Sequence, residues 1–317
     1  MDLGTHQPGG GSRFLVIAVR PGYPATPPVR VLVVYKKSRY RIYVLERKNR
    51  RMSELLRRDD PSVDSMRATH EAHEQTLARV LALLREGGAE VTGRYRAHLA
   101  RDSYDLVVTV GGDGTLLEAA RAITDTPVLA VNSAPSTSVG FFCGAEPADL
   151  EERLGLALQR RLPAVRLSRA QAFVDGAPKG PPILNDVLFC HPNPAVTSRY
   201  ILQVGSKRER QKSSGMWIGT PAGSSAAQRS AGGELLPIGS RLLQWIVREP
   251  YRPLGAPPLA LVRGTVGPRG AVRVRNQMRE AKIYLDGSHR SLDLEMGQVV
   301  EVRLHRSPLH LIGFRGR

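Results

Sequence analysis

The pattern of apolar and polar positions predicts buried strands in the first half of the chain. Continuous apolar runs occur at residues 31–35 (VLVVY), 104–110 (YDLVVTV) and 128–131 (VLAV). Runs without a polar face are typical of strands that are covered on both sides, as in a parallel sheet. The first half is therefore expected to contain a sheet with helices on both faces.

Helical spacing between these runs supplies the covering elements. Four leucines and valines between residues 77 and 84 recur at helical spacing, which predicts a helix that begins near Ser62 or Asp64 and ends at about Glu86. A second helix is predicted over residues 116–123. Strands that alternate with helices predict an open parallel sheet, in a Rossmann-like α/β domain.

The second half of the chain shows a different pattern, which predicts a β-rich, β-sandwich-like domain. Short apolar runs follow one another, separated by Gly, Pro and Asn, and helix signals are few. The runs are 183–190, 199–205, 215–220, 243–248, 258–264, 271–275, 281–286, 298–304 and 308–314. One helix is expected from Ala222 to Ser230.

These patterns divide the chain into three parts. Residues 1–29 are rich in Gly, Pro and polar residues, and we expect a mobile leader there. Residues 30–160 form the predicted α/β domain, which carries the turn at residues 111–115, and residues 161–317 form the predicted β-rich, dinucleotide-binding domain. A return of the final strand to the first domain is left open.

Charge and composition narrow the classes of partner. Lys and Arg number 46 against 29 Asp and Glu, which gives a net charge of +17 and favours an anionic partner. The basic residues are scattered, without the aromatic interleaving of a nucleic-acid stripe, so we expect neither nucleic acid nor a membrane as partner. Because only Cys143 and Cys190 are present, a disulfide scaffold is excluded and a reducing, cytoplasmic compartment is expected.

The strongest chemical signal is the turn Gly111-Gly112-Asp113-Gly114-Thr115, between a predicted strand and a predicted helix. Glycine-rich turns at helix starts expose backbone N–H groups in positive potential and bind phosphate. An acid inside such a site indicates a chemical role, either binding Mg²⁺ or accepting a proton from an attacking hydroxyl. The alternative is a tight turn in which Asp113 only caps the helix.

A second signal lies at residues 220–233 (TPAGSSAAQRSAGG). Small hydroxyl residues follow a turn into the predicted helix, where Pro221 presets φ and Gly223 allows close approach. Hydroxyl and backbone N–H groups there can bind an adenine edge, a ribose or a phosphate. The alternative is a capped helix start rich in Ser and Thr.

Together these motifs resemble the NAD kinase family. GGDGT alone is shared with diacylglycerol and sphingosine kinases, and in a near form with phosphofructokinases. The order of ILNDVLF at 183–189, KSSG at 212–215, the 220–233 segment and YLDG at 284–287 is similar to NAD kinases over about residues 31–314. It is nearest to the mitochondrial-type branch and its bacterial relatives.

The resemblance implies a reaction and a set of site residues. Asp113 is implied as the general base for the 2′-hydroxyl of the adenosine ribose of NAD. Implied binding residues are Gly111, Gly112, Gly114 and Thr115 at phosphates, Asn185, Asp186 and Asp286 at the dinucleotide, Ser225, Ala226 and Ser230 toward the adenine, Lys212 and Ser214 toward the nicotinamide, and Asn132, Phe141 and Thr220 beside them. The donor is ATP, another nucleoside triphosphate or polyphosphate, with Mg²⁺, and the chain is implied to form a homodimer or homotetramer.

Four departures from the family pattern leave the choice between NAD and NADH open. Asp186 replaces a Glu, Ser214 replaces an acid, and Ala227 stands where a Tyr is usual. The stretch from Asn132 to Phe141 is longer than the family's NxGxLGF. Two alternatives remain at this point: a lipid or sphingoid-base kinase with the same turn, and a non-catalytic NAD-binding relative.

A pair of histidines suggests a further site. His70 and His73 lie three residues apart on the predicted helix, with Glu71 and Glu74 beside them. This spacing could supply half of a metal site, but a third ligand is missing from the pattern. A solvated or half-buried helix face is the preferred interpretation, and no metal site belonging to the protein alone is predicted.

Overall fold

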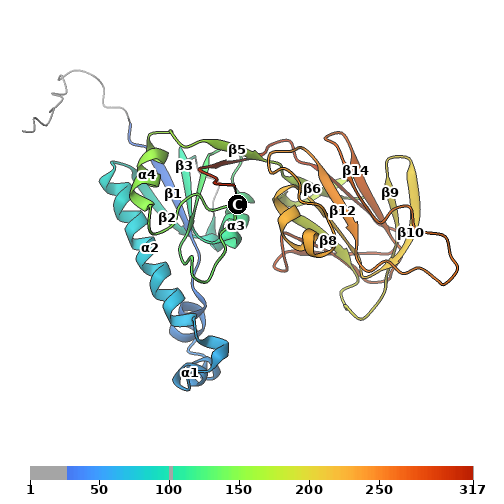
Figure 1. The fold of residues 1–317 in the computed structure, drawn as a ribbon, viewed down its shortest axis with the longest axis horizontal. Helices are drawn as coiled ribbons and strands as arrows, with labels where there is room; N and C mark the ends of the chain where they lie inside the picture. The colour runs from blue at the N-terminus through green and yellow to red at the C-terminus, as the bar shows by residue number, and fades with distance from the viewer. Residues whose placement is uncertain (1–26, 100–102, 317) are drawn as a thin grey trace, which may run out of the picture.

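The computed structural model describes residues 27–99 and 103–316 (Figure 1). Nearly all of the predicted leader therefore lies outside the described residues. The described chain forms an α/β domain and a β-rich domain side by side, as the sequence predicts. None of the helices in these ranges is long and apolar enough to cross a membrane.

The N-terminal domain is built on a six-stranded sheet with the order β2-β1-β3-β4-β18-β5. Its strands are β1 (Arg30–Tyr35), β2 (Glu90–Tyr95), β3 (Leu106–Gly111), β4 (Val128–Asn132), β5 (Ala164–Leu167) and β18 (Leu309–Ile312). The predicted strands at 31–35, 104–110 and 128–131 are confirmed. The last strand of the chain returns to this sheet beside β4, and β5 follows residue 160 but also belongs here. Because β5 runs antiparallel to β18, the sheet is mixed rather than purely parallel.

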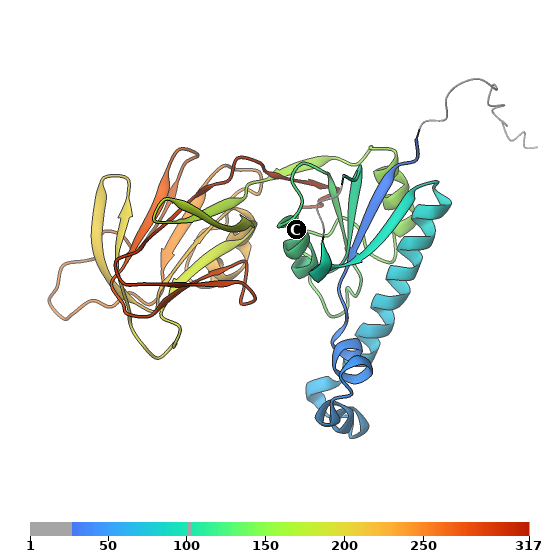
Figure 2. The same cartoon turned by 180° about the vertical axis from the view of Figure 1, so that it is seen from behind.

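Helices cover both faces of this sheet. They are α2 (Met66–Glu86), α3 (Asp113–Ala120) and α4 (Leu150–Leu158). Val31 and Val33 of β1 pack in one core with α2 and α4, whereas Leu32 and Val34 pack in a second core with α3. The predicted start of α3 at residue 116 is wrong, because Asp113 already has helical geometry. Figure 2 shows α2 on the outer side of the domain, away from the β-rich domain.

The basic stretch after β1, which the sequence left unassigned, is helical. It contains a π-helix η1 (Arg41–Glu46), α1 (Arg50–Arg57) and a 3₁₀ turn η2 (Pro61–Val63). The Asn49 side chain caps α1 by accepting the Met52 N–H at 3.0 Å, and Asp60 caps η2. These short helices extend below the sheet in Figure 1.

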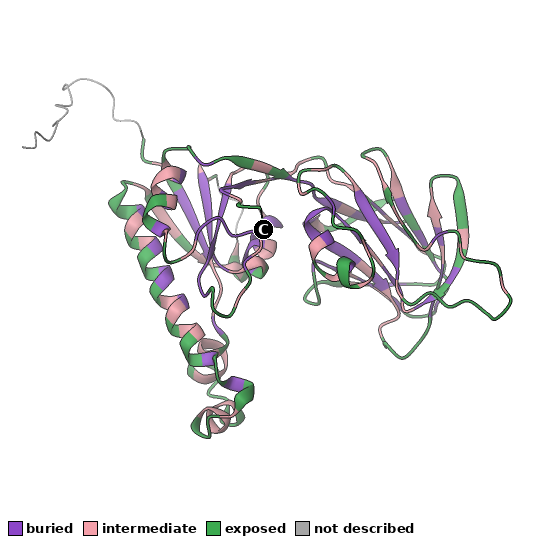
Figure 3. Ribbon diagram, in the orientation of Figure 1, coloured by how far each residue is buried: buried purple, intermediate pink, exposed green. Residues whose placement is uncertain are grey.

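The C-terminal domain consists of two antiparallel six-stranded sheets, with the orders β10-β9-β14-β17-β6-β7 and β13-β12-β11-β8-β15-β16. The strands are β6 (Ala170–Val174), β7 (Ala177–Ile183), β8 (Asp186–Cys190), β9 (Ser198–Val204), β10 (Lys207–Ser213), β11 (Met216–Gly219), β12 (Leu243–Val247), β13 (Arg263–Val266), β14 (Ala271–Asn276), β15 (Ala281–Leu285), β16 (Ser291–Leu294) and β17 (Val299–Leu304). One hydrophobic core lies between both sheets, as in a β-sandwich. Figure 3 shows the buried residues concentrated in the strands.

Two predictions for this half need correction. The single helix expected at 222–230 is two short ones, η4 (Ala222–Ser225) and α5 (Ala227–Ser230). They are separated because Ala226 leaves helical geometry, with φ −101° and ψ −131°. The run at 258–264 was placed too early, since β13 begins only at Arg263.

A buried arginine fixes the end of α3 against the start of the second domain. Arg169, which has no exposed surface, donates to the carbonyl oxygens of Ala120 (2.9 Å), Ile123 (2.6 Å) and Ser307 (2.9 Å). Burial lowers the pKa of Arg169 to about 10, so the guanidinium stays charged at neutral pH. Its positive charge lies at the carbonyl end of α3, where a cation is favourable. The helix that begins at Asp113 is thus anchored at its far end.

Candidate functional site

The GGDGT turn lies at the carboxyl end of β3, and Asp113 is the first residue of α3. Two of its glycines are required by the packing of the protein itself. A Cβ on Gly111 would clash with the Thr115 hydroxyl, and one on Gly112 would lie 2.6 Å from Ser138 Oγ. Gly114 is exposed. The turn therefore packs tightly on one side and stays open on the other.

Both carboxylate oxygens of Asp113 are held by backbone groups of another segment. The N–H of Phe141 donates to Oδ2 and the N–H of Phe142 donates to Oδ1, each at 2.9 Å. Asp113 is half-buried. Because an ionised carboxylate offers about four acceptor sites, these two bonds orient the group and leave capacity for another donor. Phe141 was predicted, but its contribution through the backbone was not.

Asn132 shapes the segment that supplies these two N–H groups. Its side-chain amide donates to the Ser138 carbonyl at 2.8 Å, and its oxygen accepts the Ala134 N–H at 3.3 Å. A Cβ on Gly140, whose φ is +58°, would lie 2.5 Å from Asn132 Nδ2. Asn132 therefore acts on the site through the loop, and Gly140 must be glycine for the loop to close on it.

Asp286, of the Asp286-Gly287 pair, binds the backbone of Asn185 and Asp186. Asp286, at the end of β15, has a left-handed backbone with φ +50°. Its carboxylate accepts the N–H groups of Leu184 (2.9 Å), Asn185 (2.7 Å) and Asp186 (3.3 Å). These bonds fix the backbone from which the Asn185 and Asp186 side chains project.

Two buried side-chain oxygens of the predicted site have no hydrogen-bond partner among the described residues. They are Asn185 Oδ1 and Thr115 Oγ1. A buried polar atom without a partner is costly, and it is retained mainly where a ligand or water completes it. Asn185 Oδ1 therefore has the capacity to accept a hydrogen bond from a ligand, whereas Thr115 Oγ1 faces the packed side of the turn against Gly111.

Burial also changes the acidity of the two aspartates. The pKa of Asp186 is raised to about 7, chiefly by burial and further by the neighbouring Asp286 charge. Burial raises the pKa of Asp286 as well, but its three backbone N–H donors and Arg121 act in the opposite direction. Asp186 is therefore the carboxyl of the pair that keeps its proton up to about neutral pH. Asp286 is the carboxyl whose ionised form is stabilised by hydrogen bonds.

The 220–230 segment lies against α3 and the Asn-Asp pair. The Thr220 hydroxyl donates to the Leu184 carbonyl, and the Thr220 N–H donates to the Asn185 carbonyl at 2.9 Å. Leu184 and Ala222 share a hydrophobic core with Leu116 and Ala119 of α3. Ser225 is half-buried, and Ala226 and Ser230 are exposed beside it.

Lys212 and Ser214 are not brought to this turn within one chain. Both line a separate cavity of about 310 Å³ together with Arg199, Glu249 and Tyr251. Figure 1 shows β10, which carries Lys212, at the side of the C-terminal domain far from α3. The structure therefore divides the predicted site residues into one assembled group and this separate pair.

The two histidines have structural partners. His73 is fully buried and contacts Ser133 Oγ at 2.9 Å and the Lys36 carbonyl at 2.7 Å, while His70 contacts Ser38 Oγ at 2.9 Å. Within the described residues, no group of three His, Cys, Asp or Glu side chains could hold a metal ion.

The comparisons with known proteins agree on one family. Residues 25–161 match the family model described as the ATP-NAD kinase N-terminal domain. A probable NADH kinase of Oryza sativa subsp. japonica is 36% identical over 220 residues, which cover 62% of this chain and 67% of that protein. An NADH kinase of Arabidopsis thaliana is 34% identical, covering 65% and 71%, and an NAD kinase of Acinetobacter baylyi is 31% identical, covering 66% and 67%.

Solved structures share the fold. The crystal structure of an NAD kinase from Archaeoglobus fulgidus in complex with ATP matches with a TM-score of 0.59 at 20% identity, covering 91% of this chain and 94% of that chain. Yeast NADH kinase complexed with NADH matches with a TM-score of 0.64 at 16% identity, covering 90% and 84%. At these identities the structural match establishes the arrangement of the two domains' strands and helices.

Proposed function

The chain belongs to the NAD kinase family, and we propose that it transfers the terminal phosphoryl group of ATP to the 2′-hydroxyl of the adenosine ribose of NAD, giving NADP. The observation that carries this proposal is the Asp113 carboxylate, oriented by two backbone N–H groups at the start of α3. The helix also packs against the segments that hold Asn185 and Thr220.

In the proposed reaction, Asp113 accepts the proton of the 2′-hydroxyl while the hydroxyl oxygen forms a bond to the terminal phosphorus of ATP. The bond between that phosphorus and the bridging oxygen breaks, and ADP leaves with the electron pair. Asp113 forms no covalent bond to the phosphoryl group. Positioning of the reactants and stabilisation of charge therefore supply most of the rate acceleration. The Phe141 and Phe142 N–H groups keep the carboxylate in one orientation for this step.

The residues present suit a magnesium ion that arrives with the donor. Asp113 has free acceptor sites, but the described residues include no cluster of acidic or histidine ligands that would hold an ion without phosphates. Asp113 is the residue placed to contact such an ion. Bound Mg²⁺ neutralises charge on the donor phosphates.

The acceptor dinucleotide is proposed to contact the assembled group. The Oδ1 of Asn185, which has no partner in the described ranges, suits a donor such as the adenine amino group or a ribose hydroxyl, and Asp186 is the next residue. Ser225, Ala226 and Ser230 are proposed to lie along the adenine. The assignment of Lys212 and Ser214 to the nicotinamide has the least support from a single chain, because they line a different cavity.

NADH is proposed as a second acceptor, since two of the relatives above are named as NADH kinases. We further propose a homodimer or homotetramer, which light scattering tests. A cytoplasmic compartment is proposed because the sequence contains only two cysteines, too few for a disulfide scaffold. The lipid-kinase alternative gains no support from the named relatives.

The proposed function is tested by incubating the protein with Mg²⁺ and each donor, ATP or polyphosphate, against each acceptor, NAD, NADH or diacylglycerol. We expect NADP or NADPH with at least one donor and no phosphorylated lipid. Phosphatidic acid without NADP would contradict the proposal. Calorimetric NAD binding without any product would indicate a non-catalytic relative instead.

A further inference from the structure

Two cationic side chains that the sequence did not single out flank the GGDGT turn. Lys36 directly follows β1, and Arg96 directly follows β2, so both leave the carboxyl edge of the sheet where Asp113 lies. A Cβ on Gly111 would lie 3.4 Å from Lys36 Cδ, so the lysine stem passes along the start of the turn. Arg96 Nη1 donates to the Gly114 carbonyl at 3.3 Å, at the other end of the turn.

Neither cation is paired with a carboxylate. Within the described part of the chain, no carboxylate lies within ion-pair distance of Lys36 or Arg96. Burial lowers the pKa of Lys36, the charge of Arg96 lowers it further, and Cys143 acts in the opposite direction. Two cations held close together without a carboxylate partner are stabilised when an anion binds between them.

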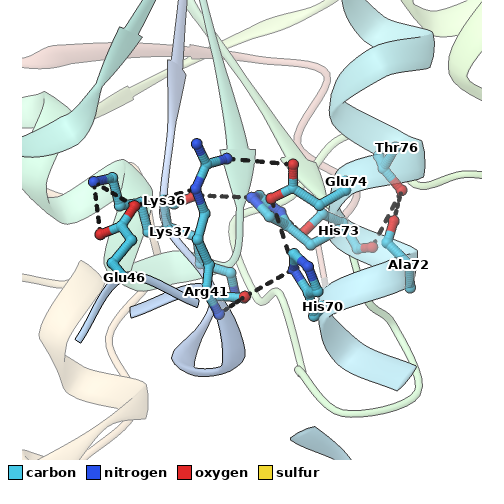
Figure 4. A network of polar contacts seen from close by, with 11 residues as sticks. Lys36, Lys37, Arg41, Glu46, His70, Ala72, His73, Glu74 and Thr76 are labelled. Atoms are coloured by element: carbon cyan, nitrogen blue, oxygen red, sulfur yellow. Dashed lines mark hydrogen bonds and ion pairs between the residues drawn. The ribbon is translucent and has the colours of Figure 1, made fainter. Parts of the chain in front are cut away.

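Lys37, the residue next to Lys36, does have a carboxylate partner. Lys37 Nζ lies 2.9 Å from Glu46 Oε2 and above the ring of Tyr95. Arg41 is likewise paired, with Glu46 and Glu74. Figure 4 shows Lys37 and Arg41 directed toward these carboxylates, whereas the contact drawn for Lys36 joins its backbone carbonyl to His73. The basic residues beside Lys36 are thus satisfied internally, and Lys36 is not.

A buried histidine fixes the backbone of Lys36 relative to the turn. The Lys36 carbonyl can only accept a hydrogen bond, so His73 Nε2 must carry the proton in that 2.7 Å contact. Burial lowers the pKa of His73, which keeps the ring neutral, so Nδ1 accepts from the Ser133 hydroxyl. The Ser133 N–H in turn donates to the Gly111 carbonyl at 2.8 Å. One imidazole therefore connects Lys36 to the first glycine of the turn.

We propose that Lys36 and Arg96, which flank the GGDGT turn, bind the phosphate chain of the phosphoryl donor. This inference rests on the proposed function, and it assigns the donor side of the site to residues outside every motif described above. A compact ammonium and a forked guanidinium both suit phosphate oxygens. Lys36 and Arg96 lie on the same edge of the sheet as Asp113. Their positive charges offset the repulsion between the Asp113 carboxylate and the donor phosphates.

The test measures binding, so it does not depend on turnover. Calorimetry determines the Kd of Mg-ATP, of inorganic tripolyphosphate and of NAD for the full-length wild type, Lys36→Met and Arg96→Gln. Each variant is expected to weaken both phosphate ligands about tenfold or more, as for the loss of one charge-assisted hydrogen bond, and to leave NAD within about twofold. Lys36→Arg is expected to recover part of the loss. The matched controls Lys37→Met and Arg41→Gln are expected to change none of these constants.

Two outcomes overturn the inference. One is an unchanged Kd for tripolyphosphate in Lys36→Met, which would place the lysine away from the phosphates. The other is an equal weakening of ATP and NAD, which would indicate a structural role. Failure of the proposed function is distinguishable, because it appears in the wild type as an absence of NADP while the phosphate constants still report on Lys36 and Arg96.

Discussion

The guanidinium of Arg121, at the end of α3, donates a hydrogen bond of 3.0 Å to the carbonyl oxygen of Asp286 in the other domain. It also contacts the Leu285 carbonyl and pairs with Glu118. Asp286 holds the backbone of Asn185, and Asp113 begins the same helix α3. This one contact therefore connects the proposed base to the proposed acceptor-binding residues across the domain boundary.

Replacing Arg121 is expected to loosen this connection. Arg121→Met removes charged hydrogen bonds to two buried carbonyls and should destabilise the fold by about 2–3 kcal/mol. It should also raise the KM for NAD about tenfold, because the Asp286 turn is no longer fixed against α3. Arg275→Met is the control, since Arg275 also donates to a backbone carbonyl, that of Gly297, in the sheet of β14 away from α3. Equal kinetic effects in both variants would mean that only general stability matters.

Asn185 is expected to act on the acceptor alone. Its Oδ1 has no internal partner among the described residues, so Asn185→Ala should leave the melting temperature almost unchanged. The KM for NAD should rise about tenfold or more, and the KM for ATP should stay within about twofold. Asn193→Ala, in a loop of the same domain, serves as the control. A similar rise for both substrates would place Asn185 elsewhere in the site.

Asp186 should make the fold less stable as the pH rises. The folded carboxyl keeps its proton to about pH 7, whereas the unfolded one loses it near pH 4. Between these values the folded state binds more protons, so stability falls with rising pH and levels off above 7. Asp186→Asn removes this titration. In urea unfolding at pH 4 to 8, the free energy of unfolding of the variant should rise relative to that of the wild type as the pH increases. A constant difference would contradict the buried, protonated state.

His73 should have the opposite effect. Its folded pKa is lowered by burial, so below about pH 6.5 the unfolded state takes up a proton that the folded state does not. Stability therefore falls as the pH falls, by at most about 1.4 kcal/mol per pH unit from this group. In urea unfolding between pH 5 and 8, the free energy of unfolding of His73→Gln should fall less steeply toward low pH than that of the wild type. Parallel curves would contradict the neutral ring.

The sequence predicted the elements that have a strong hydrophobic signal. β1, β3 and β4 are buried along nearly their whole length, so their apolar runs are continuous. β2 (EVTGRY) and β10 (KRERQKS) were missed because they are edge strands with few or no apolar positions. The start of α3 was misplaced because Gly114 and Thr115, weak helix formers, occupy its first turn.

The candidate site could be predicted only where side chains carry a motif. Asp113, Asn185 and Asp286 stand in short, recognisable segments. The N–H groups of Phe141 and Phe142 leave no trace in the sequence, because every residue but proline has one. Lys36 and Arg96 are two of 46 basic residues, and only the strand order brings them to the same edge.

If Asp113 removes the proton of the ribose hydroxyl, Asp113→Asn takes away the base while keeping the size of the side chain. The amide keeps one of the two backbone hydrogen bonds, so a loss of about 1–2 kcal/mol in stability is expected, with folding retained. Asp105→Asn is the control, because Asp105 also accepts a backbone N–H, from Arg30, but at the opposite end of β3.

The decisive measurement is the rate of NADP formation at saturating ATP and NAD, with the Kd of NAD determined on the same preparation. Asp113→Asn is expected to lower kcat by about 10² to 10⁴ while NAD still binds within a few-fold of the wild type. A kcat within a few-fold of the wild type, with NAD bound, would contradict it.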